Sequence, residues 1–238
     1  MIRLFGKNQV IERLKAHPKT IIKIICNQSA DNRFIKELAQ QFNIAHVSIP
    51  DNEFMLMANN INNQGVIAET QEFLYDDLEK ILQLPDDEKL TLIALSNITD
   101  PQNLGSILRT TACFGRFALI IPKHRSASIN ETVLRVACGG ENYIPIIQVT
   151  NLIPVLKQAK DAGYWVAGTV VEEGEDLTNF NFQFPLCLVI GAEDKGIRPG
   201  LIKHLDFKVT LPMPGAGLSL NAAVATAIFC YEVTRQRK

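Results

Sequence analysis

The chain has 238 residues and a formal net charge of −1, and 47% of its residues are hydrophobic. This length suits one large domain or two smaller ones with a substantial core. No apolar run is long enough to cross a membrane, and the start does not resemble a signal peptide. We therefore expect a cytoplasmic protein with no membrane partner. A polyanion partner would require basic groups gathered on one face.

The five cysteines are scattered along the chain and never form a CxxC pair. Each lies in an apolar segment, and their number is odd. Such cysteines are typical of reduced core residues in a cytoplasmic protein. We expect no disulfide framework and no metal site.

Residues 1–72 predict a small α/β domain. Strand patterns lie at residues 20–26, 45–49 and 65–68, and helical patterns at 7–14, 32–42 (with Asp31 as N-cap) and just after 51. Alternating strands and helices with short connections favour a compact layered module.

Residues 73–89 are acidic and contain Pro85. A segment of this composition is typical of a solvated linker, here with one helical turn at residues 78–82. We place the domain boundary in this linker.

Residues 90–238 alternate between apolar strands and helices. Strands are predicted at residues 90–95, 117–121, 144–149, 164–170, 186–190 and 207–211, and helices at 104–114, 131–138, 152–162 and 219–236. Uninterrupted apolar strands between helices predict a parallel sheet that is covered on both faces.

Three loops follow predicted strands of this sheet, and the first begins at Asn97. Asn103 is the expected N-cap of helix 104–114, and Gly115 closes that helix. Arg109 lies at the margin of the apolar stripe, where a charge is costly unless it has a partner or a function. A snorkelling arginine beside an ordinary cap is the structural alternative.

The second loop starts with Gly191, whose missing side chain lets a ligand approach the backbone. Its alternative is an ordinary polar turn. The third loop contains Pro212, Gly215 and Ser219, and Ser219 is the expected N-cap of the last helix. A helix N-terminus also attracts anions, so a capping serine can contact a ligand as well.

The common cofactor motifs are missing from these positions. The first strand of this part is followed by residues 96–100 without a glycine, and the later GAG lacks the GxGxxG spacing. These observations argue against a nicotinamide-binding Rossmann domain and against the common methyltransferase fold. The chain also has no P-loop, GxSxG or HExxH sequence.

Three motifs can be read in order at residues 97–115, 190–197 and 211–237. As a set they resemble the motifs of the SpoU (TrmH-type) ribose methyltransferases of the SPOUT class, across essentially all of residues 90–238. Residues 5–10 and 63–66 resemble the substrate-binding domain of these enzymes, which is similar to ribosomal protein L30e. Residues 121–127, 136–139 and 149–152 resemble the branch that methylates a guanosine ribose in bacterial 23S ribosomal RNA.

This resemblance implies an α/β fold of two parts. A small L30e-like domain (residues 1–72) and the linker (73–89) would precede a SPOUT domain (90–238) with a deep trefoil knot, a rare exception among protein topologies. It also implies S-adenosylmethionine as cofactor, 23S ribosomal RNA as substrate, a homodimer and no metal.

The resemblance further implies roles for individual residues. Contacts to the cofactor are expected from Thr169, Gly191, Leu211, Pro212 and Leu220. The expected catalytic residues are Asn103, Arg109, Glu193, Ser219 and Asn221. Cations available for RNA phosphates are Lys123 and Arg125, followed by the tail residues Arg235, Arg237 and Lys238, whose alternative is a solvated helix end.

Some positions depart from the family pattern. Asp194 stands where a glycine is frequent, and Ala222 and Ala223 replace a common Val-Ser pair; neither change removes an expected catalytic group. Arg109 is the candidate for handling the hydroxyl proton, although arginine keeps its own proton. Holding a phosphate or the developing alkoxide is its other role.

Two other functions fit the same motifs. One is methylation of a transfer RNA ribose. The other is a catalytically silent RNA-binding protein that retains the fold, against which the complete catalytic set argues.

Overall fold

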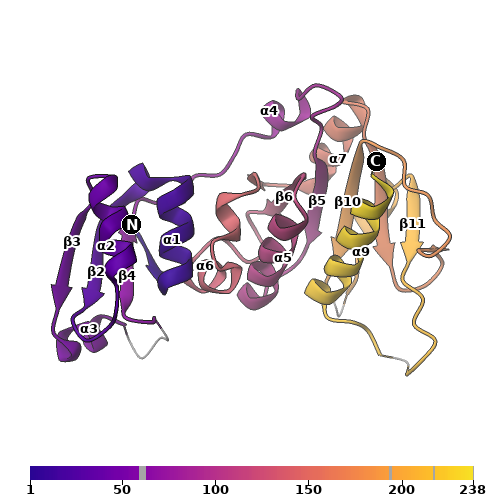
Figure 1. Ribbon diagram of the computed structural model, residues 1–238. Helices are drawn as coiled ribbons and strands as arrows, with labels where there is room; N and C mark the ends of the chain where they lie inside the picture. The colour runs from indigo at the N-terminus through magenta and orange to yellow at the C-terminus, as the bar shows by residue number, and fades with distance from the viewer. Residues whose placement is uncertain (59–62, 193–194, 217, 238) are drawn as a thin grey trace. The chain divides into compact units, whose positions relative to one another are not determined.

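The structure is a computed structural model that describes residues 1–58, 63–192, 195–216 and 218–237 (Figure 1). It contains two compact units. Unit 1 comprises residues 1–74 and 129–143, and unit 2 comprises residues 75–128 and 144–238. The expected division into residues 1–72, 73–89 and 90–238 follows the order of the chain and stays a prediction. No helix in the described ranges is both long and apolar enough to span a membrane.

Unit 1 is built on a four-stranded sheet in the order β1-β4-β2-β3. β4 runs antiparallel to β1 and β2, and β3 runs parallel to β2. The strands are β1 (Ile2–Phe5), β2 (Ile21–Asn27), β3 (Ala45–Ile49) and β4 (Val66–Thr70), and the helices of residues 1–74 are α1 (Lys7–Ala16), α2 (Arg33–Gln41) and α3 (Asp51–Ala58), with a 3-10 turn at Pro18–Thr20. The expected strands and helices are present, and β1 is an additional strand.

A segment from the middle of the chain completes unit 1. It contains α6 (Glu131–Ala137) and a 3-10 turn at Gly140–Asn142. Arg13 Nη2 on α1 donates to Glu141 Oε1 at 3.1 Å, and the Glu141 side chain is fully buried. Tyr143 also hydrogen-bonds to Glu12, and the amide of Arg3 donates to Glu131. Burial raises the pKa of Glu141 above its ordinary value, and Arg13 opposes this shift only in part.

Unit 2 is built on a seven-stranded sheet in the order β7-β6-β5-β10-β8-β11-β9. Every pairing in it is parallel, which confirms the expected parallel sheet. The strands are β5 (Thr91–Ser96), β6 (Phe117–Pro122), β7 (Ile146–Val149), β8 (Trp165–Val170), β9 (Glu175–Asp176), β10 (Leu186–Gly191) and β11 (Phe207–Thr210). The short edge strand β9 was not expected.

Helices lie on the sheet of unit 2 and bury its apolar residues. α5 (Pro101–Phe114) and α9 (Ala222–Gln236) pack against each other (Figure 1). α7 (Leu152–Asp161) and α8 (Pro199–Ile202) pack on a core that includes Leu92, Ile120 and Val189. α4 (Leu78–Leu82) is the expected helical turn, but its apolar side chains pack on the same core, so the expectation of a solvated segment is wrong for this turn. Central strands with no exposed residue, such as β5, explain why the sequence showed no period-two alternation.

Two expected helix starts are wrong. α5 begins earlier, with Asp100 as N-cap and Pro101 at its first position, and Asp100 Oδ1 accepts from Gln102 N at 2.8 Å. Proline is favoured there because its missing N–H has no helical partner. α9 begins later, with Asn221 as N-cap in place of Ser219. Asn103 therefore lies inside the first turn of α5, and Ser219 lies in the loop before α9.

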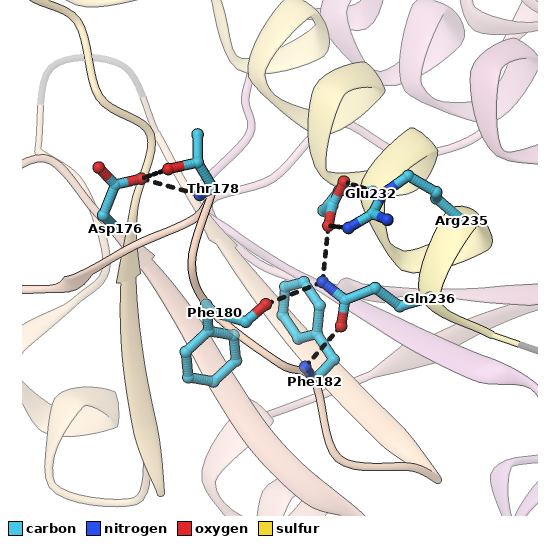
Figure 2. A network of polar contacts seen from close by, with 7 residues as sticks. All are labelled: Asp176, Thr178, Phe180, Phe182, Glu232, Arg235 and Gln236. Atoms are coloured by element: carbon cyan, nitrogen blue, oxygen red, sulfur yellow. Dashed lines mark hydrogen bonds and ion pairs between the residues drawn. The ribbon is translucent and has the colours of Figure 1, made fainter.

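Hydrogen bonds to the segment before β10 fix the C-terminal end of α9. Figure 2 shows that the Gln236 side chain accepts from Phe182 N and donates to Phe180 O, both at 2.8 Å, while Arg235 pairs with Glu232. Arg237 donates to Thr91 Oγ1 at 3.0 Å and to backbone oxygens, and burial lowers its pKa. These bonds give Arg237 a structural role, whereas Arg235 forms an ion pair on the surface with a 58% exposed side chain. The expectation that the tail contacts RNA stays a prediction, and Lys238 lies outside the described residues.

The cysteines divide between core and surface. Cys26, Cys187 and Cys230 are buried, and burial raises the pKa of Cys187 and of Cys230 to about 12. Cys113 is exposed on α5 and Cys138 is partly exposed, so the expectation that all five belong to the core is wrong for these two. Cys113 lies on the outer face of a helix whose inner face carries the apolar stripe.

The buried pair between Arg13 and Glu141 makes a stability prediction for unit 1. Glu141→Ala leaves the Arg13 charge buried without its carboxylate, so we expect a loss of about 3–5 kcal/mol in the free energy of unfolding. The matched control is Glu72→Ala, because the Glu72 side chain is 84% exposed in its pair with the N-terminus. Urea denaturation followed by far-UV circular dichroism measures both variants, and equal losses would contradict the prediction.

The same carboxyl predicts a pH dependence. Because its pKa is raised in the folded state, the native chain holds this proton more tightly than the unfolded chain. Its contribution to stability is therefore greatest below the ordinary pKa of glutamate and is lost as the pH rises through the raised value. The free energy of unfolding of wild type relative to Glu141→Gln should therefore be greatest at low pH and should fall as the pH rises through this range.

Candidate active site

A cavity of about 270 Å³ lies at the carboxyl ends of β8, β10 and β11. The ends of parallel strands meet at one edge of the sheet, where ligands of such folds bind. Four of the five expected cofactor contacts line this cavity, namely Thr169, Gly191, Leu211 and Leu220, together with the expected catalytic residue Ser219. Pro212 is exposed and is not among the lining residues.

The wall of this cavity after β10 is a loop that folds back on itself. Ala192 and Gly196 exchange two backbone hydrogen bonds of 3.2 and 2.8 Å. A Cβ atom on Gly191 would lie 2.4 Å from the Gly196 carbonyl carbon and 2.5 Å from Ile197 N. The loop's own backbone therefore requires glycine at 191, whereas the sequence argument had invoked a ligand.

The first and third motifs meet at one hydrogen bond. Asn221 Nδ2 donates to Asn103 Oδ1 at 2.8 Å, and Asn221 Oδ1 accepts from Ala223 N at 2.9 Å. One amide side chain thus caps α9 and holds the first turn of α5. This contact brings together two of the expected catalytic residues.

Arg109 lies one and a half turns further along α5. It is exposed, next to the buried Leu108, and it is not among the residues that line the cavity. Its position at the margin of the apolar stripe is as expected. Glu193 lies outside the described residues.

The two expected RNA-binding residues differ in their surroundings, because Arg125 lines a cavity and Lys123 lines neither cavity of unit 2. Lys123 is exposed after β6, whereas Arg125 lines a second cavity together with Arg198. Arg198 was missed by the sequence reasoning, and only its place directly after the second motif could have drawn attention to it. The apolar lining residues Ala225 and Phe229 of the first cavity were also missed, because helical spacing alone assigns them to the core.

Comparisons with known proteins agree with this geometry. Residues 90–231 match the SpoU rRNA methylase family, and residues 3–75 match the RNA 2′-O ribose methyltransferase substrate binding family. The first match spans more than half of the chain, so this protein belongs to the SpoU rRNA methylase family, as its motifs indicated.

Individual relatives extend the comparison over the full length. The chain is 37% identical to the 23S rRNA (guanosine-2′-O-)-methyltransferase RlmB of Pseudomonas aeruginosa, over 99% of this chain and 96% of that protein. The SpoU methyltransferase AviRb of Streptomyces viridochromogenes, solved with AdoMet, matches the fold with a TM-score of 0.83 at 24% identity, over 99% of this chain and 90% of the other. A TrmH/SpoU tRNA modifying enzyme of A. aeolicus matches with a TM-score of 0.55 at 28% identity, over 67% of this chain and 80% of the other.

Two substitutions of Asn221 can distinguish the contribution of its helix cap from that of its hydrogen bond to Asn103. Asn221→Ala removes the cap of α9 and the bond to Asn103, and we expect a loss of about 1 kcal/mol in stability. Asn221→Ser retains a capping oxygen but is too short to reach Asn103, so its stability should stay closer to wild type. Thermal denaturation compares the variants, and a serine variant as unstable as the alanine variant would show that the contact between helices dominates.

Proposed function

We propose that this protein transfers a methyl group from S-adenosylmethionine to the ribose 2′-hydroxyl of a guanosine in 23S ribosomal RNA. The 37% identity to RlmB over 99% of the chain carries this proposal. The match of residues 3–75 to a substrate-binding family supports RNA as the partner. Transfer RNA is the second candidate, because the enzyme of A. aeolicus that shares part of the fold modifies tRNA.

The cavity at the ends of β8, β10 and β11 fits the proposed cofactor. Its walls combine apolar side chains such as Leu211, Leu220 and Phe229 with exposed backbone of the loops after β10 and β11. Such walls suit an adenosine and the methionine chain of a sulfonium cofactor, held by a few polar contacts. S-adenosylmethionine supplies an electrophilic methyl group when bound. Thr169, Gly191, Leu211 and Leu220 are the residues we propose to hold it.

The reaction then needs alignment and the removal of one proton. Alignment of two bound reactants is worth roughly 7–11 kcal/mol, and the paired loops after β5, β10 and β11 supply the rigid frame. We propose that Asn103, fixed by Asn221, orients the acceptor, and that Glu193 and Ser219 complete the site. Because an arginine side chain has donors and no acceptor, the proposed role of Arg109 is to hold the phosphate or the developing alkoxide with its planar fork.

A second copy of the chain would complete this site. Arg109 projects from the exposed side of α5, outside the lining of the cofactor cavity. The neighbouring helix α9 exposes Val224 (49%) and Tyr231 (59%), which are apolar side chains that a partner would cover. We therefore propose a homodimer in the cytoplasm, formed around α5 and α9, without a metal. We also propose that the end of the chain forms a trefoil knot, as in the family.

One assay tests the function. The protein is incubated with methyl-labelled S-adenosylmethionine and total RNA from cells that lack it, and the labelled RNA is sized and digested to nucleosides. We expect label in 23S ribosomal RNA as 2′-O-methylguanosine. Label in small RNA would replace the proposal by transfer RNA methylation, and no label would favour a silent RNA-binding protein.

Arg109 makes the sharpest catalytic prediction. Arg109→Ala should lower the rate of methyl transfer by about 100-fold or more, the usual effect of removing a group that stabilises developing charge. Arg109→Lys keeps the charge but lacks the planar fork and should recover only part of the rate. Calorimetry should find unchanged affinity for S-adenosylmethionine. Loss of cofactor binding in either variant would show that the role of Arg109 is structural.

A further inference from the structure

A second cavity of about 650 Å³ lies in unit 2, outside the carboxyl ends of β5, β6 and β7. Asn97 follows β5, His124 and Arg125 follow β6, and Asn151 follows β7, while Arg198 and Leu201 come from the segment after β10. The volume lies within the range of small-molecule sites. Among the residues given a role above, Arg125, a cation available for RNA phosphates, lines this cavity.

The topology of the sheet places this cavity where ligands are expected. From β5 the chain proceeds outward to β6 and β7, then crosses to the other side, so that β10 lies next to β5. The strand order reverses between β5 and β10, and the two flanking connections leave the sheet on opposite sides. Such a switch point creates a crevice that open α/β sheets use for binding. Asn97 and Arg198 line the cavity from the two strands that flank the switch.

The chemistry of the lining is that of a nucleotide site. Arg125 and Arg198 are exposed guanidinium groups, and neither has an ion-pair partner in the part of the chain that the structure describes. Guanidinium groups match phosphate oxygens in a planar, paired geometry. The remaining wall includes the apolar residues Leu152, Ile153 and Leu201; Ile153 is partly exposed and offers a base a surface to pack against, while Leu152 and Leu201 are mostly buried in the core. No carboxylate lines the cavity among the described residues.

Two residues that line this cavity have an unusual backbone conformation. Asn97 (φ 64°) and Arg125 (φ 57°) both adopt the left-handed conformation without being glycine. A left-handed arginine is uncommon, and strained residues of this kind cluster at functional sites. The surrounding loops hold both residues, because Ile98 O accepts from Ser126 Oγ at 3.0 Å and from Ala127 N at 2.8 Å. The two loops that supply Asn97 and Arg125 are thus tied to each other.

One short segment separates the second cavity from the proposed cofactor site. Residues 190–192 and 195–197 line the first cavity, residues 198–201 line the second, and Ile202 lines the first again. A ligand in the second cavity would therefore contact a segment that continues directly from the wall of the proposed cofactor site. Neighbouring units of one RNA strand satisfy this arrangement, since each carries a phosphate and a base.

We infer that this cavity binds a nucleotide of the RNA strand close to the methylated guanosine, with its phosphate on Arg125 and Arg198 and its base against Ile153. The inference rests on the proposed function for the identity of the strand. It assigns Arg198 to substrate binding, and it gives Arg125 a defined partner in that task. Neither residue takes part in the chemical step.

The test measures binding apart from methylation. Fluorescence anisotropy with a labelled single-stranded fragment of 23S ribosomal RNA is recorded for the full chain at several salt concentrations. Arg198→Ala and Arg125→Ala should each weaken binding by roughly tenfold or more and lower the salt slope by about one. The matched control is Lys203→Ala, which removes one exposed positive charge just beyond α8 and lines neither cavity. Affinity for S-adenosylmethionine should be unchanged in all three.

A second measurement identifies the ligand. Guanosine monophosphate and inorganic phosphate are titrated into the protein, with the Leu152 and Ile153 methyl resonances followed by NMR. We expect the nucleotide to bind more tightly than phosphate and to shift these resonances. Equal binding of both would overturn the nucleotide assignment in favour of an anion site, and equal RNA affinity of Arg198→Ala and Lys203→Ala would overturn the site itself.

The results of these experiments can show independently whether the nucleotide site and the proposed function are correct. A wild-type protein that binds RNA through Arg198 but transfers no methyl group would overturn the function and leave the site. A wild-type protein that methylates RNA while Arg198→Ala methylates it with unchanged KM would overturn the site and leave the function. Arg198→Lys guards against misfolding, since it should recover part of the RNA affinity if a phosphate is bound.

Discussion

The parallel pairing of β5 with β10 is the constraint on which the arrangement of unit 2 depends. Their register sets Ser96 beside Gly191, so that the loops after both strands leave the sheet at the same level. The loop after β11 joins them from two strands away. Three segments that are far apart in the sequence therefore meet at one edge, where the hydrogen bond between Asn103 and Asn221 also joins the first and the third. Backbone hydrogen bonds between the strands determine where these loops begin, and the side chains adjust only the details of the loop positions.

Several residues at this edge have a structural role as well as a proposed functional one. Asn221 caps α9 and fixes Asn103 with the same amide, and Gly191 is required by the backbone of its own loop. A substitution at either position therefore changes the fold before it changes any chemistry. The capping alternatives drawn from the sequence were at Asn103 and Ser219, whereas the structure has Asp100 and Asn221 as the caps.

The sequence predicted the sheet well because its strands are buried on both faces and read as continuous apolar runs. It failed at the starts of α5 and α9. Asn103 and Ser219 are good capping residues, but Pro101 prefers the first helical turn, and the loop before α9 extends two residues further to reach Asn221. Local propensity cannot choose between neighbouring caps when the choice depends on a contact with another helix. It also could not show Arg198 and Arg125 at one cavity, because that requires the reversal of strand order between β5 and β10.

The fold also determines which positive charges are available to a substrate. The net charge is −1, so RNA binding must depend on where the cations are and not on their number. Arg237, which looked available from the sequence, donates to Thr91 and to backbone oxygens. Arg13 is committed to the buried Glu141. Arg125 and Arg198 remain without a carboxylate partner in the described ranges, and they converge from loops that the strand reversal brings together. Two cations without a carboxylate partner in the described ranges therefore lie at the edge where the proposed substrate has to bind.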